Sequence, residues 1–367
     1  MEREIVSYVK RHIKKYPKIE TIDIYKLIYQ ASFLAGHLIG SNAFDYLVKE
    51  ANLCDNQTTQ NELYEYISND VVRVNLYPYL NYYSIESLFD LFLKCNNEYV
   101  NENDGDYLKY SYEQLIDIYK GYTENNSRRY DKMNTYKNFI KDMLVVENRV
   151  LEYLVNETSI NKTIPSHSKI YKSIYKPSYR LALAKDLNIE VRARKVQMYI
   201  DQVKANINTL DKKVLIALEG RCASGKTTIS KLIKDVTLIH IDDFFDEKKE
   251  ERLNYTELIN LLNRIKNAKV GEIIEYNAFS CRDWKYYKKE IAVNNVILFE
   301  GVYSYSEEIR DYFDKVIFSV ISKDEQLYRL NKRENEYYLQ KYLNEWIPRE
   351  EEYYESFDFV SNANILI

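Results

Sequence analysis

The chain has 367 residues and a formal net charge of −4 at pH 7, because 52 Lys and Arg nearly balance 56 Asp and Glu. This balance argues against a protein whose main partner is nucleic acid, and no apolar run approaches the roughly 20 residues of a membrane-spanning helix. The four cysteines form no CxxC pair, and the charged N-terminus lacks the apolar stretch of a signal peptide. We therefore expect a soluble, cytoplasmic protein with no membrane association, zinc site or disulfide framework.

The first part of the chain has mainly helical patterns. Apolar residues recur at three- and four-residue spacing in FDYLVKEANL, IESLFDLFLKC and KNFIKDMLVVENRVLEYLV. The one convincing extended stretch is VVRVNLYPYL, at residues 71–80, and RARKVQMYIDQVKANINTLDKK predicts a helix that leads into the second part. The length suits two domains, so we predict a mainly α-helical N-terminal domain over residues 1–205.

From about residue 206, short apolar strands alternate with helical patterns. The strands expected here are VLIALEG, VTLIHI, EIIEY, NVILFEG, KVIFSVIS and, at the edge of the sheet, NILI. Such alternation predicts a mostly parallel sheet with helices on both faces. We therefore predict an α/β domain over residues 206–367.

A glycine-rich loop lies between the first strand and the first helix of this domain. Gly220, Gly225, Lys226 and Thr227 match G-x-x-x-x-G-K-[ST], the phosphate-binding loop of P-loop NTPases. Its N–H groups and the helix N-terminus favour a phosphate, while Lys226 reaches the β- and γ-phosphates and Thr227 offers its hydroxyl to Mg²⁺. The predicted nucleotide contacts are Gly220, Ala223, Ser224, Gly225, Lys226, Thr227 and Thr228. We therefore expect this domain to bind ATP with Mg²⁺.

Acidic residues end two further strands. Asp242 and Asp243 follow VTLIHI directly, where the carboxyl end of a strand next to the loop strand would face the ligand. A carboxylate there can accept a proton from an attacking hydroxyl or hold Mg²⁺ through water, although a helix cap or a solvated loop is the alternative. Glu300 and Gly301 end NVILFEG, and Glu300 stands at the place of a metal-binding acid, with a strand-ending turn as the alternative. We predict Thr227, Asp242 and Glu300 as the residues around the metal.

A basic helix follows the last long strand. LYRLNKRE carries Arg329, Lys332 and Arg333, and the two arginines are four residues apart on one face. Such a face can close over the phosphates and stabilise negative charge during transfer. We predict catalytic roles for Arg329 and Arg333, beside Lys226 and Asp242, with a solvated basic face as the alternative.

Several motifs together resemble the uridine kinase and phosphoribulokinase group of P-loop kinases. They are GRCASGKTT, IDDFF, EYNAFSCRD, VILFEG, YRLNKRE and the tail WIPREEEYYESFDF…ANILI, over roughly residues 212–367. The resemblance implies that Asp242 activates the acceptor hydroxyl and that Glu300 helps to hold Mg²⁺. It also implies that Tyr276 and Arg282 contact the acceptor, and we place Asp243 among the substrate-binding residues.

The chain departs from that group at three positions. Cys281 stands at or near the place of a His that contacts the base, Phe245 replaces a Tyr, and Glu336 replaces a further lid Arg. These departures leave phosphoryl transfer plausible but put uridine itself in doubt.

The first half resembles an N-terminal region attached to such kinase domains in bacterial proteins of unassigned function. The resemblance lies in IYQASFLAGHLIG, VVRVNLYPYL and SKIYKSIYKPSYRLA, and it implies no activity. His37, His167 and Arg180 are candidate polar site residues there, and we hypothesise that this domain completes the kinase site, with Arg180 and His167 near the acceptor. A structural role is the alternative for each.

We predict that the chain transfers the γ-phosphoryl group of ATP to a hydroxyl of a small molecule. A uridine-like nucleoside or a related sugar-bearing metabolite is the first choice of acceptor. A kinase for a sugar or a nucleoside monophosphate is one alternative. The other is a nucleotide-dependent regulatory module with little turnover. The sequence leaves open the acceptor, the base preference, homo-oligomerisation and the role of the N-terminal domain.

Overall fold

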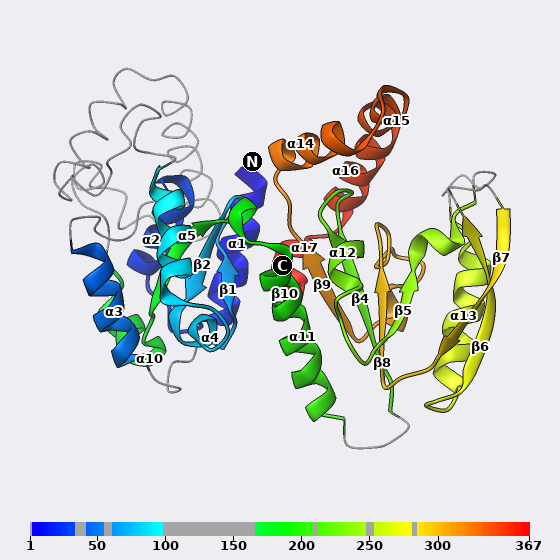
Figure 1. Cartoon of the computed structure of the whole chain (residues 1–367), viewed down its shortest axis with the longest axis horizontal. Coiled ribbons are helices and arrows are strands. Elements are labelled where there is room, and N and C mark those ends of the chain that lie inside the picture. Colours follow the sequence, from blue (N-terminus) through cyan, green and yellow to red (C-terminus); the bar gives the residue numbers. More distant parts are fainter. Residues whose placement is uncertain are drawn as a thin grey trace. The chain divides into compact units, whose positions relative to one another are not determined.

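The computed structural model describes residues 2–33, 42–54, 61–97, 166–207, 212–246, 253–280 and 285–367. These residues form two compact units, Met1–Leu187 and Asn188–Ile367 (Figure 1). The candidates His37, Cys281 and Arg282 lie outside the described residues.

The first unit combines helices with a small antiparallel sheet. In this sheet β2 (Val71–Asn75) lies between β1 (Tyr64–Tyr66) and β3 (Tyr179–Leu183). The helices described are α1 (Glu2–Lys15), α2 (Thr21–Phe33), α3 (Ala43–Leu53), α4 (Leu76–Leu80), α5 (Ile85–Asn97) and α10 (Lys169–Tyr175). The unit is therefore a mixture of helix and sheet.

The helical patterns at residues 44–53 and 85–95 are confirmed as α3 and α5, whereas the one at 137–155 lies outside the described residues. The expectation of a mainly helical domain missed the sheet. Residues 71–80 are extended only to Asn75 and continue as α4. β1 has only three residues, and every residue of β3 is buried, so neither strand shows a period of two. β3 also joins the sheet from far along the chain.

The second unit is built on a five-stranded parallel sheet, as the alternating pattern predicted. Its strands follow the order β10-β9-β4-β8-β5. They are β4 (Val214–Gly220), β5 (Thr237–His240), β8 (Val296–Glu300), β9 (Lys315–Ser319) and the edge strand β10 (Ile365–Leu366). The helices described are α11 (Ile189–Ala205), α12 (Lys226–Ser230), α13 (Tyr255–Asn267), α14 (Lys323–Arg333), α15 (Glu336–Lys341), α16 (Ile347–Ser356) and α17 (Phe359–Asn362).

A separate hairpin stands beside this sheet. The predicted strand EIIEY is part of β6 (Ile273–Ser280), which pairs with β7 (Lys285–Ala292) in antiparallel register. A 3-10 turn, η3 (Ile241–Phe244), follows β5 and contacts β6. Within the described ranges, every helix is too short or too polar to span a lipid bilayer.

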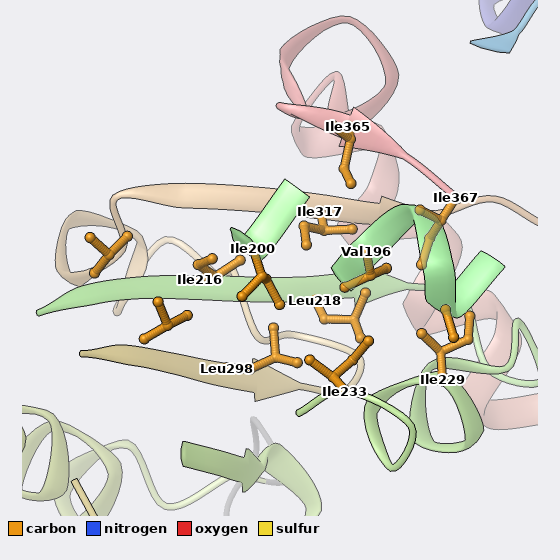
Figure 2. Close-up of a cluster of buried hydrophobic side chains, with 13 residues drawn as sticks. Val196, Ile200, Ile216, Leu218, Ile229, Ile233, Leu298, Ile317, Ile365 and Ile367 are labelled. Atoms are coloured by element: carbon orange, nitrogen blue, oxygen red, sulfur yellow. The ribbon is translucent and has the colours of Figure 1, made fainter. Parts of the chain in front are cut away.

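Helices cover both faces of the parallel sheet. Figure 2 shows the apolar cluster on one face, where α11 and α12 pack on alternate residues of β4 and β8 and on Ile317 of β9. Its labelled members are Val196, Ile200, Ile216, Leu218, Ile229, Ile233, Leu298, Ile317, Ile365 and Ile367. On the other face the Phe318 ring lies 5.2 Å from that of Phe359 in α17 and 5.7 Å from that of Tyr354 in α16, between ring centroids.

The helix α11 belongs to the second unit rather than to a linker. Val196 and Ile200 are fully buried in the cluster of the parallel sheet, and the division between the units falls after Leu187. The domain boundary predicted from the sequence, after residue 205, instead places α11 in the first domain. Periodicity identified this helix, but only packing shows which core its apolar face joins.

We predict that a fragment of residues 188–367 unfolds cooperatively, whereas one of residues 206–367 melts at a lower temperature or without a cooperative transition. The shorter fragment lacks Val196 and Ile200, and burying each such side chain contributes about 1.5–3 kcal/mol. Circular dichroism melts of the two fragments measure this. Equal melting temperatures would contradict the assignment of α11 to the second unit.

Candidate functional site

The glycine loop, residues 220–228, joins β4 to α12 at the carboxyl edge of the parallel sheet. Gly220 has a φ of +147°, and a Cβ there would lie 2.5 Å from the Ser319 carbonyl oxygen. Gly225 has a φ of +95° at the N-cap position of α12. Ala223 also has a positive φ, of +60°. The two motif glycines are thus required by different constraints, close packing against β9 at Gly220 and left-handed backbone at Gly225.

Five consecutive carbonyl oxygens of this loop, from residue 220 to residue 224, are held by side chains. The donors are Lys226 to Gly220 and to Arg221 (2.9 Å), Gln326 to Cys222 (3.2 Å), Arg329 to Ala223 (3.1 Å) and Arg192 to Ser224 (2.9 Å). In a planar trans peptide the next N–H points away from the carbonyl. Anchoring these carbonyls therefore fixes the directions of the loop N–H groups.

Arg192 on α11 was not identified from the sequence. Its guanidinium is buried and bonds also to the Ser319 hydroxyl (2.9 Å) and to the Ile367 carbonyl (3.2 Å). It therefore ties the loop to β9 and to the C-terminus. The signal in the sequence is a basic residue on the apolar face of a helix. That signal does not predict which residues the side chain contacts.

Two buried carboxylates hold α16 against the loop, and both were missed in the sequence. Glu219, the last residue before Gly220, accepts hydrogen bonds from the Tyr353 and Tyr354 hydroxyls at 2.8 Å each. Glu350 accepts the Cys222 N–H at 2.9 Å. Burial raises the pKa of both carboxyls, and the nearby Lys226 ammonium opposes the shift. A charged residue inside VLIALEG was the available signal for Glu219.

The predicted metal residues Thr227 and Glu300 are in contact. The Thr227 hydroxyl donates to Glu300 at 3.2 Å, and Glu300 is almost fully buried. His240 lies opposite Glu300 in the sheet register, and its Nδ1 contacts the other Glu300 oxygen. Carboxylate and hydroxyl oxygens are hard ligands that suit Mg²⁺. His240, which the sequence analysis passed over, is therefore a neighbour of this oxygen pair.

The expected strand order needs a correction. β8 pairs with β4, and β5 pairs with β8, so the strand before Asp242 is not next to the loop strand. Parallel pairing between strands distant in sequence is invisible to local pattern. Asp242 still follows a strand whose carboxyl end lies at the same edge, because all the strands point one way.

Asp242 and Asp243 are adjacent but differ in environment. Asp242 is an exposed residue, and its carboxylate accepts no hydrogen bond from the described residues. Desolvation by the surrounding protein and then the Glu300 carboxylate raise its pKa. Asp243 is buried and accepts bonds from the Tyr276 hydroxyl (2.6 Å) and the Lys289 ammonium (2.7 Å). Asp242 is therefore the accessible carboxylate, and Asp243 joins η3 to the β6–β7 hairpin.

The predicted acceptor contacts are only partly brought together. Tyr276 is bonded to Asp243, and its ring stacks on that of Phe244 with centroids 5.6 Å apart. Arg180 belongs to the first unit, where its guanidinium is buried and pairs with Glu50 at 2.8 Å. His167 lies in the same unit and contacts other residues there, whereas Arg282 lies outside the described residues.

The two predicted lid arginines differ in their contacts. Arg329 donates both to the Ala223 carbonyl of the loop and to Glu325 at 2.7 Å. Arg333, about half exposed, contacts Glu334 and donates to the Tyr342 hydroxyl at 3.1 Å. Among the described residues, the hydrogen bond from this pair to the loop comes from Arg329.

Comparisons with known proteins find matches among solved structures alone. No protein-family model matches the chain, and no curated protein matches it. Among solved structures, a possible uridine kinase from Bacillus stearothermophilus has a TM-score of 0.36 and 18% identity, covering 48% of this chain and 99% of its own. A protein described provisionally as a fructose transport system kinase from Silicibacter sp. TM1040 has a TM-score of 0.34 and 14% identity, covering 49% and 99%. These scores are too low to carry an argument about activity.

The two aspartates lead to opposite predictions for stability. Folding raises the pKa of Asp242 above its ordinary value of 3.8, so the stabilisation from the protonated form is lost as pH rises through the folded pKa. At pH 7 we therefore expect Asp242→Asn to melt above the wild type. Asp243→Asn should melt lower, because it weakens bonds to a charged and a phenolic partner, a loss of about 2 kcal/mol.

Thermal melts without nucleotide or metal measure both variants. A lower melting temperature for Asp242→Asn, together with a wild-type melting temperature for Asp243→Asn, would contradict the environments assigned to the two aspartates.

Proposed function

We propose that the second unit is an ATP-dependent kinase that phosphorylates a hydroxyl of a small molecule. The preferred acceptor is a uridine-like nucleoside or a related sugar-bearing metabolite. The observation that carries this proposal is the solvent-open Asp242 carboxylate beside the Thr227–Glu300 contact, at the edge where the glycine loop ends. A base open to solvent suits a reaction in which an external hydroxyl must lose its proton.

Three groups divide the proposed work. Asp242 accepts the proton of the acceptor hydroxyl as the new oxygen–phosphorus bond forms and the bond to ADP breaks. Its raised pKa makes it a stronger base than an ordinary aspartate. Lys226 moves from the loop carbonyls to the β- and γ-phosphates, and Arg329, already bonded to the loop, stabilises charge on the transferring group.

Thr227 and Glu300, with Asp242 nearby, would hold Mg²⁺, which when bound neutralises phosphate charge. The contact between the first two residues and the oxygen-rich donor set fit this ion. His240 positions one Glu300 oxygen, which leaves the other for Thr227 and the ion.

An acceptor panel tests the function directly. Full-length protein with ATP and Mg²⁺ is incubated with nucleosides, sugars and nucleoside monophosphates, and ADP release is measured. We expect stimulation by a nucleoside or another sugar-bearing acceptor. ATP binding with no stimulation by any acceptor class would contradict a kinase and favour the regulatory alternative.

We predict that Asp242→Asn lowers kcat for the acceptor found in that panel by roughly 10²–10⁴-fold, because it removes the general base. ATP binding, measured by calorimetry, should be retained. In the wild type, the acid limb of kcat/KM should lie above pH 3.8, since the pKa of Asp242 is raised from that value. Wild-type turnover in Asp242→Asn would show that another group accepts the proton.

We predict that Lys226→Met weakens Mg·ATP binding roughly tenfold to a hundredfold, the loss of hydrogen bonds made by a charged group. Lys226 is buried, so methionine is chosen to keep most of the stem volume. Lys231→Met, at the exposed end of the same helix, is the matched control. Calorimetry gives the affinities and circular dichroism checks the fold. Equal affinities for the two variants would contradict the assignment of the loop.

A further inference from the structure

The first unit contains a sheet face that is polar although it is buried. Glu65 on β1 and Arg73 on β2 are cross-strand partners, and the Arg73 guanidinium lies 4.8 Å from the centre of the Tyr179 ring on β3. All three side chains are almost fully buried. Burying charge is costly unless every charged group is paired or hydrogen-bonded, so the partners of these groups must be accounted for.

The surrounding helices add further polar groups to this face. Gln30 on α2 accepts two bonds from Arg73 (3.0 and 2.8 Å), and His12 on α1 contacts the same guanidinium at 3.2 Å. His167, just before α10, contacts Asp23 at 2.9 Å and the Tyr179 hydroxyl at 2.7 Å. The result is one connected network across the sheet and three helical segments.

The buried carboxylates of this network are well satisfied. Asp23 is bonded by His167 and by the N–H groups of Ser168 (2.9 Å) and Glu20 (3.1 Å). Glu65 is bonded by the Tyr16 hydroxyl (3.0 Å) and the His12 ring (3.3 Å), with Lys15 at 3.5 Å. Neither carboxylate therefore needs a further hydrogen-bond donor.

The donors, in contrast, are in excess. Lys26 is 9% exposed, and its ammonium, which is not fully shielded from solvent, has no hydrogen bond or ion pair with the described residues. The Tyr171 hydroxyl is fully buried and has no hydrogen-bond partner there either. Arg73 is in hydrogen-bond contact with two neutral side chains, Gln30 and His12, rather than with a carboxylate.

These donors lie together. Lys26 is three residues after Asp23 and four before Gln30, so it shares their face of α2, and it is near enough to His167 to lower the pKa of that ring. The Tyr171 ring stacks on the His167 ring with centroids 4.4 Å apart. Burial and the nearby charge of Arg73 lower the pKa of Lys26 to about 8, so its ammonium still predominates at pH 7.

We propose that this polar face is a binding site for a small oxyanion, the phosphate or carboxylate group of a ligand, held by Lys26, Arg73 and the Tyr171 hydroxyl. An oxyanion supplies the acceptor oxygens that these donors lack, and a negative charge opposite two cations. A purely structural polar core would be expected to satisfy its own donors, because each unmet buried group costs about 1–3 kcal/mol. The site is independent of the proposed kinase function, which lies in the other unit.

The test uses the full-length protein and two conservative substitutions, Lys26→Met and Tyr171→Phe, each of which removes a donor but keeps most of the side-chain volume. Lys94→Met, at an exposed position of α5, is the matched control. Affinities for inorganic phosphate and for acetate are measured separately by calorimetry, at an ionic strength held constant with chloride. Melting temperatures are measured with and without each anion.

We expect the melting temperature of the wild type to rise with phosphate, with acetate or with both. The Lys94→Met protein should behave in the same way. Lys26→Met should bind the effective anion at least roughly tenfold more weakly, and Tyr171→Phe should also lose affinity. Without anion, Tyr171→Phe should melt no lower than the wild type, because it loses a buried hydroxyl that has no hydrogen-bond partner among the described residues. Any binding of phosphate at the glycine loop is the same in all four proteins. Differences in anion affinity between the proteins therefore report binding in the first unit.

Which anion responds decides between a phosphate-bearing and a carboxylate-bearing ligand. Wild-type affinity in both Lys26→Met and Tyr171→Phe would overturn the proposal. Absence of any anion effect that depends on Lys26 would equally overturn it, and a Tyr171→Phe protein less stable than the wild type would then show a structural polar core.

Discussion

The second unit depends on the anchoring of one short stretch of backbone. The carbonyls of residues 220–224 are each held by a side chain, and the donors come from α11, α12 and α14. A loop that exposes several N–H groups in one direction is not stable by itself, since its peptide dipoles repel one another. Holding the carbonyls outward offsets this repulsion and orients the N–H groups before any anion arrives.

The same constraint explains buried charges that would otherwise only destabilise the fold. Glu219 and Glu350 lie close enough to the loop for the Lys226 ammonium to affect their pKa. Hydrogen bonds from two tyrosines and a loop N–H satisfy them and fasten α16 at the same time. Buried ionisable groups are tolerated where they are fully bonded, and here they connect the C-terminal helices to the loop.

The two units present anion-attracting groups on different frameworks. In the second unit they are backbone N–H groups at the end of a parallel strand, aligned by the start of a helix. In the first unit they are side chains gathered over a small antiparallel sheet, with Arg73 and Lys26 as the cations. Backbone donors at a helix start suit a phosphate, whereas guanidinium and ammonium groups form charge-assisted hydrogen bonds to carboxylate or phosphate.

Sequence alone determined what depends on neighbouring residues: the alternation of strands and helices in the second unit, the helices α3 and α5, and the glycine positions of the loop. A left-handed backbone at Gly225 and a lysine directly after it are local requirements, so their spacing is visible in the chain. Tertiary structure alone decided the strand order, the membership of α11, the sheet of the first unit, and the difference between Asp242 and Asp243. Each of these is set by contacts between residues far apart in sequence, such as Asp243 with Tyr276 or Arg192 with Ser224, and local periodicity carries no information about such partners.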